Sequence, residues 1–138
     1  MELKSDHAQF QAEIEQRGIQ SLVHFTRLES VTAIVGERRI LPRNQLHNIA
    51  FEWQELITPN APQRYDNPKN LNTSITHPNV WLVNTFRDKW YPASRFCIIG
   101  IDPKYIYEKR TTFAITNATY PSAREFGIKG DLQTFRSI

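Results

Sequence analysis

Residues 22–35 read LVHFTRLESVTAIV and join an apolar strand directly to an amphipathic helix. The segment IQSLVHF has the short apolar run of a strand, and LESVTAIVGERR spaces its apolar residues three and four apart, as one face of a helix does. The helix is therefore predicted to begin just after Thr26. At such a junction, His24 and Thr26 either hold a ligand or make ordinary structural hydrogen bonds, and the local pattern allows both.

Further helices and strands are predicted before and after this junction. A first helix is expected near residues 6–17, with Phe10 and Ile14 on one face and Gly18 as its stop. Later in the chain we expect a strand at TSIT (73–76), a helix capped by Asn79 through VWLVNTFRD, a core strand at RFCIIGIDP and a short strand at TTFAIT. Helices early and strands late favour an α+β fold.

The bulk composition is that of one globular domain spanning residues 1–138. The chain is 40% hydrophobic, 12% aromatic and 22% charged. Its apolar runs are all shorter than the roughly 20 residues that a membrane span needs, and the polar start MELKSDHAQF has no signal-peptide core. We therefore expect a cytoplasmic protein with no membrane partner.

Charge is unevenly distributed along the chain. Residues 1–60 carry six Lys/Arg against eight Asp/Glu, and residues 61–138 carry eleven against six. A basic second part suggests an anionic partner such as nucleic acid or phosphate, although proteins that bind neither often show the same excess.

No metal is expected from the sequence, because the histidines are scattered and the single cysteine, Cys97, has no second thiolate nearby. Cys97 lies in the run FCIIGI and is predicted to be a small buried hydrophobe.

A long proline-containing segment, residues 41–72, interrupts the regular elements, with one possible short helix at LHNIAFEWQEL. Loops of this length inside a domain are often binding loops or lids. Arg64 lies in this segment. Its guanidinium either pairs with a nearby aspartate at the surface or offers forked donors to a phosphate.

Taken in order, the pieces HFTRLESVTAIVGERRIL, RYD, TSITHPN, FCIIGIDPKYIY and TFAITNATYPSA resemble the DarT family of toxins. Members of that family use NAD to ADP-ribosylate bases of single-stranded DNA. The resemblance covers about residues 20–135. It implies an ADP-ribosyltransferase-like fold, a split antiparallel β-core with flanking helices, and as possible partners single-stranded DNA and a macrodomain-type antitoxin.

The resemblance also assigns roles to residues. It implies that His24 and Thr26 hold NAD, the co-substrate, and that Phe25 points the other way, into the core. It implies a loop arginine needed for activity, for which Arg64 is the candidate by position and Arg43 the alternative. Arg87, Lys89 and Arg95 are candidates for contacts to the DNA backbone.

The sequence departs from the family at the catalytic glutamate, which the family carries on a strand downstream of the Asn-Ala element. Glu125 lies close to Asn117-Ala118 and is predicted to begin a surface helix instead. The resemblance therefore implies a domain that lacks its C-terminal part, or is completed by another chain, and that transfers ADP-ribose slowly or undetectably.

Two other functions remain open. One is a non-catalytic module that binds nucleic acid or NAD. The other is a small nuclease with His24 and His77 as acid and base, since neutral histidines suit proton transfer near neutral pH.

Overall fold

The computed structural model describes residues 1–42, 44–45, 69–115 and 122–138. Their contacts divide the chain into two compact units. Of the described residues, the terminal unit contains 1–20, 102–115 and 122–138. The central unit contains 21–42, 44–45 and 69–101.

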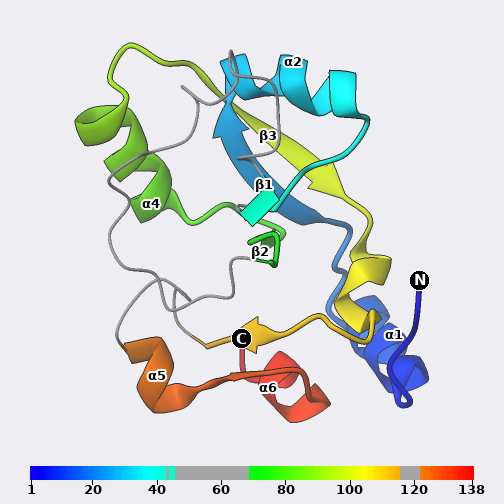
Figure 1. The fold of residues 1–138 in the computed structure, drawn as a ribbon. Coiled ribbons are helices and arrows are strands. Elements are labelled where there is room, and N and C mark those ends of the chain that lie inside the picture. Colours follow the sequence, from blue (N-terminus) through cyan, green and yellow to red (C-terminus); the bar gives the residue numbers. More distant parts are fainter. Residues whose placement is uncertain (43, 46–68, 116–121) are drawn as a thin grey trace. The chain divides into compact units, whose positions relative to one another are not determined.

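The central unit is built on a three-stranded antiparallel sheet (Figure 1). Its strands are β1 (Leu22–Arg27), β2 (Ser74–Ile75) and β3 (Phe96–Ile101), in the order β2-β1-β3. β1 pairs with β3 over six consecutive residues, from Leu22 opposite Ile101 to Arg27 opposite Phe96. β1 is therefore the middle strand, and its sequence neighbour α2 starts without any intervening loop.

Three helical elements accompany this sheet: α2 (Leu28–Glu37), α4 (Val80–Thr85) and the π-helix η2 (Phe86–Trp90). The Asn79 side chain accepts a hydrogen bond from the Leu82 amide at 3.0 Å, which caps α4 as the sequence predicted. η2 continues α4 directly. Its Phe86 ring contacts the Phe25 ring edge to face, with centroids 5.4 Å apart, so η2 packs on the face of the sheet that carries Phe25.

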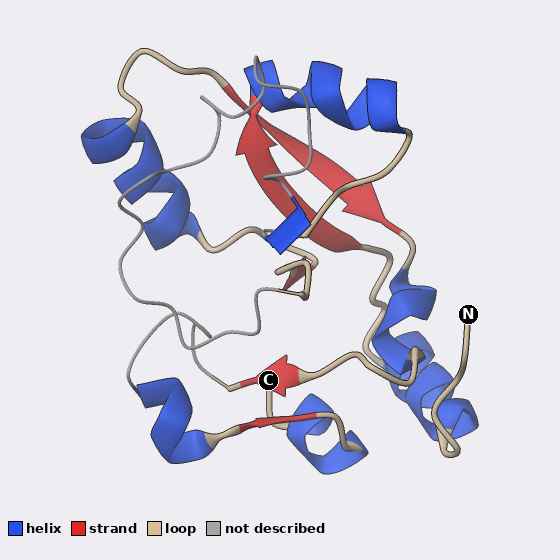
Figure 2. Cartoon of the chain, in the orientation of Figure 1, coloured by secondary structure: helices blue, strands red, loops and turns tan. Residues whose placement is uncertain are grey.

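The terminal unit contains α1 (His7–Gln16), the 3₁₀ helix η3 (Pro103–Tyr107), α5 (Ser122–Phe126) and α6 (Leu132–Arg136), with a small antiparallel sheet of β4 (Phe113–Ala114) and β5 (Ile128–Lys129) (Figure 2). Its core is a cluster of three phenylalanine rings, Phe10, Phe113 and Phe135, with centroids 5.1 to 5.8 Å apart. These rings are almost fully buried, and they join α1, β4 and α6.

The Lys4 side chain packs against this cluster. Its ammonium lies 5.7 Å from the centroids of the Phe10 and Phe113 rings and donates to the Thr111 carbonyl oxygen at 2.7 Å. Burial lowers the pKa of Lys4, while the nearby carboxylates of Asp6, Glu108 and Asp131 oppose that shift. A charged side chain thus ties the N-terminal segment to the turn before β4.

The structure confirms a mixed helix and sheet protein with a small antiparallel sheet. The specific ADP-ribosyltransferase-like architecture and the single domain over 1–138 stay predictions. Among the described residues, no helix combines the length and the apolar character required to cross a bilayer.

Two expectations about β3 were wrong. The strand expected at RFCIIGIDP is present as β3, but within the described residues it lies at the edge of its sheet instead of in a core, and Ile98 is 58% exposed. Cys97 is only half-buried for the same reason, since an edge strand has a neighbour on one side only. An apolar run indicates a strand, but it does not say how many neighbours that strand will have.

Candidate functional site

The candidate site lies on β1, where His24 is the third of six strand residues rather than the strand end that the sequence suggested. The ladder between β1 and β2 contains only two residue pairs, Leu22 with Ile75 and Val23 with Ser74. At the next position along β1, the contact is made by the His24 side chain instead of by strand pairing. Its Nδ1 lies 3.0 Å from the main-chain carbonyl oxygen of Asn72.

This hydrogen bond fixes the protonation pattern of the neutral ring. A carbonyl oxygen only accepts, so Nδ1 carries the hydrogen and Nε2 keeps its lone pair. Burial lowers the pKa of His24 from its ordinary value, and the hydrogen bond to Asn72 partly offsets that shift. The half-buried imidazole therefore favours its neutral form and presents an acceptor at Nε2.

Thr26 lies two residues along the same strand and on the same face as His24, because side chains alternate across a strand. The ladder places Ile99 opposite His24 and Cys97 opposite Thr26. Among the described residues, neither His24 Nε2 nor the Thr26 hydroxyl has a hydrogen-bond partner. A hydrogen-bond acceptor and a hydroxyl thus lie two residues apart on the same face of β1.

Phe25 points to the opposite face, as predicted, where it meets Phe86. On that face an aromatic cluster continues from Phe86 to Trp90 at 4.6 Å and to Tyr91 at 5.8 Å between centroids. The guanidinium of Arg27 lies 4.3 Å from the centre of the Tyr91 ring. These aromatic contacts thus pack against one face of β1, and His24 and Thr26 lie on the other face.

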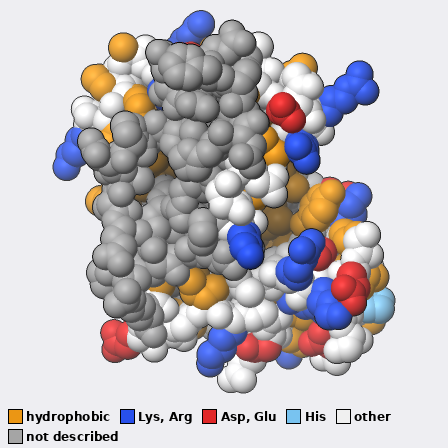
Figure 3. Space-filling view, viewed as in Figure 1, with side chains coloured by type: hydrophobic (Ala, Val, Ile, Leu, Met, Phe, Trp, Pro, Cys, Tyr) orange, Lys and Arg blue, Asp and Glu red, His pale blue; other side chains and the backbone are white. Residues whose placement is uncertain are grey.

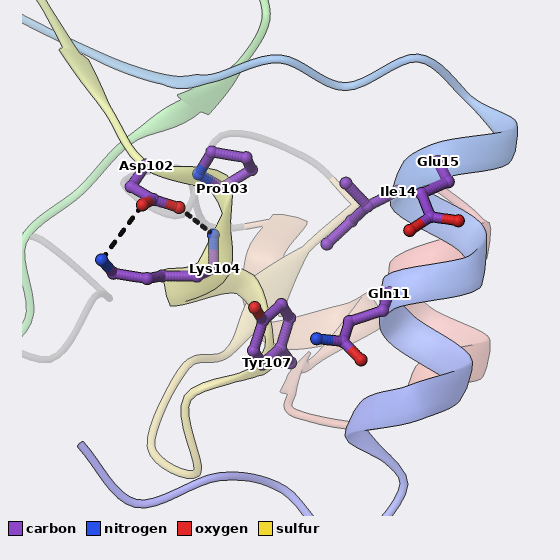
Figure 4. Close-up of a pocket in the computed structure, with 7 residues that line it drawn as sticks. All are labelled: Gln11, Ile14, Glu15, Asp102, Pro103, Lys104 and Tyr107. Carbon is purple, nitrogen blue, oxygen red and sulfur yellow. Dashed lines mark hydrogen bonds and ion pairs between the residues drawn. The ribbon is translucent and has the colours of Figure 1, made fainter.

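A separate shallow pocket lies within the terminal unit, between α1 and η3 (Figure 4). Gln11 of α1 points toward Tyr107 of η3 across it, whereas the Lys104 side chain extends away from α1 and pairs with Asp102 at 3.0 Å. Its volume of about 180 Å³ is below the 300 to 1,000 Å³ of typical ligand pockets. It is too small for a dinucleotide.

Several predicted site residues lie elsewhere or outside the described part of the chain. Arg64 and Arg43, the candidate arginines, are both outside the described residues. Glu125 lies on α5 with its side chain exposed, as expected for a surface helix. His77, the second histidine of the nuclease hypothesis, is exposed just after β2.

Basic side chains do not gather into one patch on the face shown in Figure 3, where Lys and Arg lie among Asp and Glu. Arg87, one candidate for DNA contacts, forms an ion pair with Asp88 at 2.7 Å, which raises the Arg87 pKa through that hydrogen bond. Within the described ranges, no group of three or more His, Cys, Asp or Glu residues is arranged to hold a metal ion.

The sequence predicted His24 and Thr26 as site residues, which stays a prediction, and gave no sign of the contact between His24 and the Asn72 carbonyl oxygen. A backbone acceptor carries no side-chain signature, and it is the segment just before β2 that brings Asn72 to the ring. Comparisons with protein-family models, with curated proteins and with solved structures found no match.

Proposed function

We propose that this chain is a DarT-like, NAD-dependent ADP-ribosyltransferase domain that acts on bases of single-stranded DNA. The observation that carries the proposal is the pair formed by His24 Nε2 and the Thr26 hydroxyl on one face of the middle strand. An acceptor next to a hydroxyl suits the adjacent hydroxyls of a ribose, which both donate and accept hydrogen bonds.

The neutral state of His24 matters for this role. Protonation would turn Nε2 from an acceptor into a donor, and the half-buried ring resists protonation because its pKa is lowered. The Asn72 carbonyl, just before β2, also holds the ring in place, so the orientation of Nε2 is set before a ligand arrives. Preorganised polar groups of this kind lose little conformational entropy on binding.

Catalysis needs two further groups in this proposal. Arg64 supplies forked donors to the diphosphate of NAD. A carboxylate stabilises the positive charge that develops on the ribose when the bond to nicotinamide breaks. Glu125 is the one glutamate that follows the Asn117-Ala118 element in the printed sequence, and it lies on a helix rather than on a strand. We therefore expect binding of NAD with slow or undetectable transfer.

The position of Glu125 favours one alternative, a non-catalytic module that binds NAD or nucleic acid. A transfer assay separates the two. Purified chain is incubated with a single-stranded oligonucleotide and NAD labelled on its adenosine phosphate, with the duplex form of the same oligonucleotide as the control.

Label on the single strand supports the enzyme, and its loss in Arg64→Ala assigns the arginine. NAD binding without transfer supports the module. Cleavage of the oligonucleotide with no label incorporated contradicts both and favours the nuclease.

A further inference from the structure

In the part of the chain that the structure describes, the outer edge of β3 is open. β3 (Phe96–Ile101) pairs with β1 on one side, and among the described residues no strand lies on its other side. In an antiparallel ladder, alternate residues direct both backbone groups to opposite sides. Half of the N–H and C=O groups of β3 therefore point away from β1, and the described part of the chain offers them no backbone partner.

The side chains do not protect this edge. The sequence FCIIGI has no charge and no proline, and it pairs with β1 residue for residue, without a bulge. Ile98 is 58% exposed, and Gly100 is exposed with open space where a Cβ would be. Charges, prolines and bulges are the usual devices that keep an edge strand from pairing with another chain, and β3 has none of them.

We propose that β3 pairs antiparallel with β3 of a second copy of this chain, across a twofold axis. The two three-stranded sheets then form one continuous six-stranded sheet. A twofold axis perpendicular to a sheet keeps each face on its own side, so one residue of β3 must lie opposite itself. Ile98 is the natural centre, because its exposed side chain gains the most from burial against its copy.

This register is self-complementary in size. It places Phe96 of one copy opposite Gly100 of the other, where the missing side chain leaves room for the ring. A bulky residue at both positions would clash or leave the pair poorly packed. The strand thus fits its own copy better than it fits an arbitrary extended segment.

The charges at the two strand ends also favour antiparallel pairing of identical strands. Arg95 immediately precedes β3 and Asp102 immediately follows it, and both are exposed. Antiparallel pairing brings Arg95 of one copy near Asp102 of the other, and Asp102 accommodates this cation beside Lys104. Parallel pairing would instead set like charges together, which is unfavourable.

Sedimentation velocity of the full chain, from micromolar to millimolar concentration, tests the pairing. We expect a reversible monomer to dimer equilibrium. Ile98→Lys should be monomeric throughout, because two lysines would meet at the axis. The matched control is Val35→Lys on α2, where Val35 is 68% exposed, and it should dimerise as the wild type does. A monomeric wild type, or an Ile98→Lys variant that dimerises equally well, overturns the proposal.

Cross-linking tests the register and does not depend on the lysine variant folding. Opposite residues in an antiparallel pair have Cα atoms about 4.5 to 5.5 Å apart, within the range of disulfides. The double variant Cys97→Ser, Ile98→Cys should therefore form a disulfide-linked dimer under mild oxidation. Cys97→Ser, Val35→Cys should stay monomeric on a non-reducing gel. Equal cross-linking of both variants, or of neither, contradicts pairing centred on Ile98.

Discussion

Nδ1 of His24 donates to the main-chain carbonyl oxygen of Asn72 at 3.0 Å, at the point where the ladder between β1 and β2 has ended. The side chain thereby continues the contact between the two segments after the backbone pairs stop. The bond holds the ring against the sheet and leaves the lone pair of Nε2 beside Thr26. The same hydrogen bond thus joins the two segments and sets the orientation of the His24 ring.

Stability should decrease in mild acid because of His24. Burial lowers its pKa in the folded chain below the ordinary value of 6.5, so the unfolded chain takes up the proton first as the pH falls. The contribution is complete above 6.5 and is lost as the pH falls through 6.5 toward the folded-state pKa. Thermal midpoints measured by circular dichroism from about pH 8 to about pH 5 check this.

The variant His24→Gln isolates the effect, since its amide can donate to Asn72 without titrating. Its midpoint should fall less steeply with acid than that of the wild type. His77→Gln, a change at an exposed histidine, should follow the wild-type curve. If the His24→Gln and wild-type curves run parallel, the half-buried neutral histidine contributes nothing to the pH dependence.

Lys4 should contribute far more to stability than an ordinary surface lysine. Lys4→Met keeps the apolar stem but removes the charged hydrogen bond to the Thr111 carbonyl, and we expect a loss of about 1.5 to 3 kcal/mol. Lys109→Met breaks only an exposed ion pair with Glu2 and should cost about 0 to 1 kcal/mol. Urea unfolding measures both, and equal losses would remove the special role of Lys4.

Two substitutions at the ends of α1 and α2 should change stability in opposite directions, because one removes a glycine and the other introduces one. Gly18 follows α1 with φ +62°, and Arg38 follows α2 with φ +53°, so both adopt the left-handed conformation that favours glycine. Gly18→Ala should cost about 1 to 2 kcal/mol. Arg38→Gly should stabilise the chain by less, because glycine also gives the unfolded chain more freedom. Urea midpoints that shift in the same direction for both variants would contradict this.

Local patterns in the sequence predicted most of the regular elements. The apolar spacing of residues 22–35 predicted a strand followed at once by a helix, and the structure has β1 ending at Arg27 and α2 starting at Leu28. Asn79 was predicted to cap a helix because its side chain precedes an apolar run, and it does so. These features depend on neighbours a few residues apart, which a sequence displays directly.

Non-local features were not predictable in the same way. β1 and β3 are separated by almost 70 residues, and nothing in FCIIGI shows that β3 pairs on one side only. The π-helical turn at Phe86–Trp90 was read as a continuation of the preceding helix. α6 was missed, although Asp131 accepts from the Thr134 amide at 2.8 Å and gives a recognisable capping signal before Leu132. The candidate helix at 46–56 lies outside the described residues.

The central claim is that His24 and Thr26 bind NAD from one face of β1, and an isothermal titration of NAD into matched variants tests it most directly. We predict that His24→Ala and Thr26→Val each raise Kd by about two- to tenfold, the cost of one lost hydrogen bond, while both variants keep a cooperative thermal transition. Ser74→Ala removes a hydroxyl opposite Val23, on the other face of the sheet, and should leave Kd unchanged. Equal Kd values for all three variants and the wild type, or no NAD binding by the wild type at millimolar concentration, would contradict the account.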